Sequence, residues 1–125
     1  MQLKKRAYFG FRICQLNVRF MTGRGREVAD LMREKKVDVI CVQGTLCKGN
    51  RAKEISDGYE LYISGTNKQG RYGVGLILSG ELKNALIDVH RKNDRIIRLK
   101  MRRRGEIMNI ISAYAPQVGC TEDDK

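Results

Sequence analysis

The sequence predicts an α+β fold in which one mixed β-sheet carries a helix on one face. Residues 11–42 show a strand, a helix and a strand in succession, and the last third of the chain alternates in the manner of antiparallel strands. The chain has 125 residues, of which 42% are hydrophobic, which suffices for the core of one domain but not of two. We therefore expect one domain over residues 11–125, after a basic leader at residues 1–10.

The two strands of the first unit are expected to be buried on both faces. Residues 11–18 have no wholly polar face, and residues 37–42 are almost continuously apolar and rich in β-branched side chains. A strand, a helix and a second strand favour parallel pairing, which places the carboxyl-terminal ends of the two strands side by side. Asn17 and Gly44 are then expected to be neighbours.

The helix of this unit is predicted over residues 26–36. Val28, Leu31 and Met32 fall at positions i, i+3 and i+4, which makes a narrow apolar stripe along one side of a helix. We expect this stripe to pack against the sheet.

The remaining elements follow from turn residues and alternation. Polar residues predict a loop over 48–58, and glycines at 65–73 separate two expected strands. Three further segments alternate with period two, which predicts three antiparallel strands. The expected strands are residues 59–63, 73–78, 85–90, 95–102 and 106–114.

A ladder of positive charge is expected on the middle strand of the last three. Its apolar residues alternate with Arg98, Lys100 and Arg102, so that one face is apolar and the other cationic. The whole chain has 25 Lys and Arg against 14 Asp and Glu, a net charge of +11, which favours a polyanion such as DNA bound through its phosphate backbone. A highly soluble charged surface is the alternative. The candidate nucleic-acid contacts are Arg95, Arg98, Lys100, Arg102, Arg103 and Arg104.

The cysteines and the hydropathy pattern suggest an intracellular protein, nuclear or cytoplasmic rather than secreted. Cys14, Cys41, Cys47 and Cys120 form no CxxC pair, so reduced thiols are expected and a zinc site is not. No apolar run approaches the roughly 20 residues that span a bilayer, so we expect no membrane partner.

Four segments in order resemble the endonuclease/exonuclease/phosphatase superfamily. They are ICQLNVR, TGRGREVADLMREKKVDVICVQGT, YGVGLIL and NDRIIRLKMRRRGEIMNIISAYAPQVG. More narrowly, the chain resembles the amino-terminal half of the apurinic-type endonuclease domain of RTE-class LINE retrotransposons and of their craniofacial development protein relatives. The resemblance implies a partial α/β sandwich, with the second sheet missing.

The resemblance also implies a chemistry, which is Mg²⁺- or Mn²⁺-dependent hydrolysis of a phosphodiester that nicks DNA. Asn17 matches the asparagine beside the metal, and Tyr114 matches the active-site tyrosine on the phosphate side. Gly44 occupies the position of the family's glutamate ligand, and glycine offers no carboxylate to a hard cation. We therefore expect no tightly bound cofactor, and Asn17 and Tyr114 are interpreted as vestigial.

Three interpretations of function stay open at this point. The first is an inactive endonuclease fragment, because the family's Asp-x-Asn and Asp-His motifs do not occur in the printed sequence. The second is a basic nucleic-acid-binding module without catalysis, and the third is an endonuclease completed by a second half in trans. An inner sheet face without its second sheet would be exposed, which favours self-association.

Overall fold

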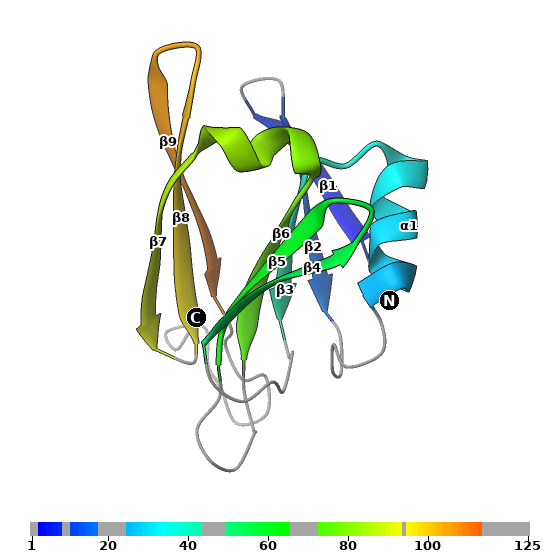
Figure 1. Ribbon diagram of the computed structural model, residues 1–125, viewed down its shortest axis with the longest axis horizontal. Helices are drawn as coiled ribbons and strands as arrows, with labels where there is room; N and C mark the ends of the chain where they lie inside the picture. Colours follow the sequence, from blue (N-terminus) through cyan, green and yellow to red (C-terminus); the bar gives the residue numbers. More distant parts are fainter. Residues whose placement is uncertain are drawn as a thin grey trace.

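A computed structural model describes residues 3–8, 11–17, 25–43, 50–65, 73–93 and 95–113. These residues form three layers, in which a six-stranded sheet lies between a helix and a three-stranded sheet (Figure 1). No helix of this described part is long and apolar enough to cross a membrane. The α+β class predicted from the sequence is confirmed, with a mixed sheet and a helix on one face.

The six-stranded sheet has the strand order β1-β2-β3-β6-β5-β4. Strands β2 and β3 pair in parallel and flank helix α1 in the sequence, so the predicted βαβ unit is confirmed. All other neighbours in this sheet pair antiparallel. Its elements are β1 (Leu3–Tyr8), β2 (Phe11–Asn17), α1 (Gly25–Lys35), β3 (Val39–Gln43), β4 (Arg51–Ser56), β5 (Tyr59–Ser64) and β6 (Val74–Leu78).

Helix α1 covers one face of this sheet with the predicted stripe. Val28 and Met32 are fully buried and pack with Leu16, Ile40 and Ile77 of the sheet. Ala29 is buried as well, whereas the predicted Leu31 is only half-buried. The apolar stripe is therefore shifted slightly around the helix from its predicted position.

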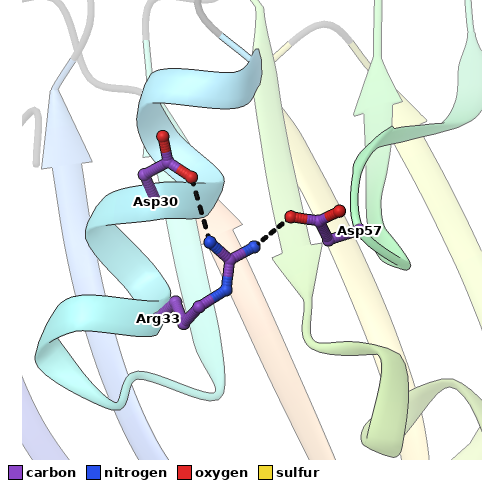
Figure 2. A network of polar contacts seen from close by, with 3 residues as sticks. All are labelled: Asp30, Arg33 and Asp57. Atoms are coloured by element: carbon purple, nitrogen blue, oxygen red, sulfur yellow. Dashed lines mark hydrogen bonds and ion pairs between the residues drawn. The ribbon is translucent and has the colours of Figure 1, made fainter.

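A polar network joins the outer side of α1 to the turn between β4 and β5 (Figure 2). Arg33 donates to Asp30 at 3.1 Å and also forms an ion pair with Asp57. The guanidinium lies 5.9 Å from the centroid of the Tyr59 ring. Because all three charged side chains are 49–68% exposed, water screens the network, and it orients the turn more than it stabilises the fold.

One expectation is wrong, because the second sheet that was expected to be missing is present in part. The three predicted antiparallel strands do not extend the first sheet but form a separate one, in the order β7-β8-β9. Helix η1 (Gly80–Ala85), with Leu82 buried in the core, redirects the chain between the two sheets. The strands are β7 (Leu86–Asn93), β8 (Ile96–Arg103) and β9 (Glu106–Ala113).

The apolar face of β8 explains why this sheet packs where it does. Ile97, Leu99 and Met101 are at most 1% exposed and lie in one cluster with Val39 of β3 and Leu76 of β6. The inner face that the sequence analysis expected to be bare is therefore covered. Self-association stays a prediction, and the exposed large hydrophobic residues of the described part are Ile87, Ile107 and Ile111.

Two strands occur where the sequence analysis expected none. β1 lies within the basic leader and pairs with β2, and β4 replaces the predicted polar loop. Both are edge strands of the sheet, and the first four residues of β4 are exposed. An edge strand needs no apolar alternation and tolerates charge, so neither segment had the pattern by which buried strands are found.

Candidate functional site

Three strands from the two sheets end at one edge of the sandwich. The parallel register of β2 and β3 places Asn17 opposite Gln43, and the Nε2 amide of Gln43 donates to the carbonyl oxygen of Ala113 at 2.6 Å. The arrows of β2, β3 and β9 point to the same lower edge of the molecule in Figure 1. We call this edge, defined by Asn17, Gln43, Ser64, Asn93 and Ala113, the strand-end rim.

Two further contacts hold β9 beside β3 below the rim. The hydroxyl of Ser112 donates to the carbonyl oxygen of Val42 at 3.2 Å, which satisfies a side chain that is 1% exposed. The thiol of Cys41 lies 3.9 Å from the carbonyl oxygen of Ile111. Side chains of both strands thus bond to the backbone of the other, and this fixes how far apart the two sheets are at the rim.

The other side of the rim is built from β5 and β7. The hydroxyl of Ser64 donates to the carbonyl oxygen of Asn93. The guanidinium of Arg91 donates to the carbonyl oxygens of Ile63 at 2.8 Å and Arg51 at 3.0 Å, and so crosses from the second sheet to the first. The hydroxyl of Ser64 and the guanidinium of Arg91 thus bond to backbone carbonyl oxygens of the other sheet, and in this way they join the two sheets.

Along the chain, the predicted catalytic residues lie at or directly after the ends of the strands that form the rim. Only part of their structure is described. The backbone of Asn17 lies in β2 opposite Gln43, which confirms the predicted side-by-side ends of the two strands. The side chain of Asn17, and all of Gly44 and Tyr114, lie outside the described residues. Gly44 directly follows Gln43 and Tyr114 directly follows Ala113 in the chain, so the strands that lead to both residues meet at the rim.

The described residues of the rim do not fit a divalent cation. Mg²⁺ and Mn²⁺ prefer oxygen ligands with at least one carboxylate, and the five residues that define the rim contain none. Within the described ranges, no three His, Cys, Asp or Glu side chains gather as a metal site. Gln43, which directly precedes Gly44 in the chain, already donates to Ala113.

The six predicted nucleic-acid contacts do not form one surface. Arg98, Lys100 and Arg102 alternate with the buried residues of β8 and therefore share the outer face of the second sheet, as the alternation predicted. Arg103 lies on the opposite, inner side, with its guanidinium 4.5 Å from the centroid of the Phe11 ring. Arg104 lies in the turn after β8, with a positive φ of 53°, and Arg95 precedes the strand.

Burial keeps the cysteine beside the rim unreactive. Loss of water around the thiol raises the pKa of Cys41 to about 12, and the nearby Cys14 acts in the same direction. A thiol below its pKa is protonated, and the thiolate is the form that reacts. In a Cys47→Ser, Cys120→Ser variant, we expect a thiol-reactive dye at pH 8 to label the native protein very slowly and two thiols to react after unfolding in urea. Fast labelling of both thiols before unfolding would contradict the buried positions of Cys14 and Cys41.

Sequence reasoning missed the side chains that join the two sheets at the rim. Gln43 gave a recognisable signal, because a polar residue ends an otherwise apolar strand. Ser64 and Arg91 gave none, since each donates to a backbone carbonyl oxygen at least 28 residues away and such partners leave no local pattern.

Two solved structures with a similar fold are endonucleases. The structure is similar to the endonuclease domain of TRAS1, a telomere-specific non-LTR retrotransposon, with a TM-score of 0.58, 16% identity and coverage of 83% of this chain and 45% of that one. It is also similar to an AP endonuclease from Archaeoglobus fulgidus, with a TM-score of 0.61, 26% identity and coverage of 85% and 41%.

Curated relatives come from a related family, and no family model matches the chain. Craniofacial development protein 2 of Bos taurus is 30% identical over 101 residues, which are 80% of this chain and 17% of that protein. The protein of the same name from Tragulus javanicus is 34% identical over 61 residues, 49% of this chain and 11% of that protein. The chain thus spans less than half of these two structures and a small part of these curated relatives. The fold and these relatives together show that the chain belongs to the endonuclease/exonuclease/phosphatase superfamily.

Proposed function

We propose that this chain is a catalytically inactive derivative of a metal-dependent endonuclease domain of retrotransposon type. The observation that carries this proposal is the strand-end rim, where the strands that lead to Asn17, Gly44 and Tyr114 meet and the five residues that define the rim include no carboxylate. Gly44 follows directly at the position where the resemblance expects a glutamate. The pairing of these strand ends supports a retained framework, and the five residues that define the rim supply no carboxylate to a cation.

The chemistry of phosphodiester hydrolysis explains why this loss matters. A cation on the phosphate stabilises the charge that develops in the transition state, and it needs anionic oxygen ligands to stay bound. The amide of Gln43 is neutral, and its nitrogen bonds to Ala113. The five residues that define the rim offer hydrogen-bonding groups, which can hold backbone or phosphate oxygens, and no anionic ligand for a dication.

The first test of this proposal is nicking of supercoiled plasmid in Mg²⁺ or Mn²⁺. We expect no nicking above the rate of a buffer control, because the anionic anchor for the metal is absent. A Gly44→Glu variant of the same chain should also be inactive, since one carboxylate supplies neither a general base nor a second set of ligands.

The Asn17→Ala variant defines which result would contradict the proposed inactivity. Nicking that needs the metal and disappears in Asn17→Ala would show that the rim is a working active site. Activity that persists in Asn17→Ala would instead point to a contaminating nuclease, and the preparation would have to be purified further before the comparison is repeated.

A second candidate function is binding of nucleic acid without cleavage. Arg98, Lys100 and Arg102 favour it, because they lie on one outer sheet face at alternate positions of β8, about 7 Å apart along the strand. That spacing is close to the separation of successive phosphates in a nucleic-acid strand. Among the described residues, these three form no ion pair with a carboxylate. Arg102 is exposed and Arg98 and Lys100 are half-buried, so phosphates would reach Arg102 most readily.

A further inference from the structure

A cavity of about 250 Å³ lies between the β8–β9 turn and the start of β2. It is at the opposite end of β2 from Asn17, and the strand of seven residues places it roughly 20 Å from the strand-end rim. The cavity is therefore separate from the candidate site described above.

The walls of the cavity are mostly apolar. Phe11 and Met101 are each 1% exposed and form its inner part, while Met108 is half-buried and Ile107 is 49% exposed at its mouth. Methionine side chains are flexible and polarisable, and they make favourable contacts with aromatic rings. The cavity thus has the mostly apolar lining of a small-molecule site.

Two arginines and one glutamate form the mouth of the cavity. On the inner face of β8, Arg103 is the next residue after Met101, at a position where another apolar residue would have closed the core. Its guanidinium covers the ring of Phe11. Arg104 and Glu106 complete the mouth. Among the described residues, none of these three charges forms an ion pair, so the mouth keeps a net positive charge.

We propose that this cavity binds a small planar aromatic anion. The ring of the ligand would lie against the side chains of Met101 and Met108, which are paired on the inner face of the sheet, and its anionic group would accept hydrogen bonds from Arg103 and Arg104. A guanidinium that already stacks on Phe11 is held in place before the ligand arrives, so less side-chain entropy is lost on binding. Glu106 opposes an anion and weakens its binding.

The methionines allow a direct test with 2-naphthoate as the probe. The protein is labelled with ¹³C at its methionine methyl groups, and the signals are assigned with Met→Leu variants. We expect saturable shifts of the Met101 and Met108 signals as 2-naphthoate is added. Met32 lies under helix α1 in the other core cluster, and its signal serves as an internal control that should not move.

Three variants test the charges at the mouth. Arg103→Gln should weaken binding by about tenfold, the effect of one charge-assisted hydrogen bond. Arg102→Gln removes the same charge from the next residue, whose side chain lies on the outer face, and should leave the affinity nearly unchanged. Glu106→Gln removes the opposing carboxylate and should strengthen binding.

Several results would overturn the proposal. One is the absence of shifts at Met101 and Met108 at millimolar 2-naphthoate, or shifts that are largest at Met32. Another is equal binding of the neutral 2-naphthamide, or equal losses in Arg103→Gln and Arg102→Gln, since the anion would then not be recognised at this mouth. Because the readout is binding and does not involve the rim, the result is independent of whether the chain cleaves DNA.

Discussion

The Leu99→Ala variant is expected to lose about 2–5 kcal/mol of unfolding free energy, the usual cost of removing a fully buried leucine side chain. Leu99 is 0% exposed and belongs to the cluster that joins the two sheets. Its loss leaves a cavity between layers that cannot close easily, because both are held by backbone hydrogen bonds. Urea unfolding followed by circular dichroism measures the change.

The matched control is Ile111→Ala on the outer face of the same sheet. Ile111 is 57% exposed, so its truncation should change stability by no more than about 1 kcal/mol. The pair of variants therefore tests the arrangement of the second sheet as well as one residue. If both substitutions cost the same, the β7-β8-β9 sheet does not pack on the first sheet through the face described above.

Replacement of Arg98, Lys100 and Arg102 by glutamine is expected to weaken DNA binding by about tenfold or more at physiological salt. Each phosphate contact releases counterions, so the slope of log K against log salt should become shallower by about 2 to 3 for three lost contacts. Fluorescence anisotropy with a labelled duplex, measured over a series of salt concentrations, gives both numbers.

A variant with the same loss of charge elsewhere separates the face from the net charge. Arg26, Lys36 and Lys53 are exposed, and replacing all three by glutamine removes three positive charges away from β8. We expect this control to keep most of the salt slope. Equal effects of the two triple variants would mean that DNA responds to overall charge and that the outer face of β8 has no special role.

The elements with buried, periodic patterns could be predicted from the sequence. Three sequence patterns each correspond to a surface that the fold buries, namely the apolar run of β3, the stripe of α1 and the alternation of β8. β4 could not be predicted, since its pairing with β5 leaves most of its side chains in water. Alternation also could not show whether β7, β8 and β9 extend the first sheet or form a second, because both arrangements bury one face of each strand.

The candidate site shows the same division. The parallel pairing that sets Asn17 opposite Gln43 follows from the βαβ pattern, so this part of the rim was predictable. The bond from Gln43 to Ala113 was not, because it depends on how the two sheets meet. Arg103 was grouped with its basic neighbours, whereas its place on the inner side of β8 follows from the strand's alternation continuing to its last residue.

The three contacts between β3 and β9 have a consequence for the order of folding. Each joins residues that are 70 positions apart in the chain, so none can form until β9 has been made and the long intervening segment has been ordered. Long-range pairing of this kind slows folding, while the local βαβ unit can form early. During synthesis, the apolar inner face of the first sheet stays exposed to water until β8 and β9 have been made. Chaperones would recognise the nascent chain during that interval.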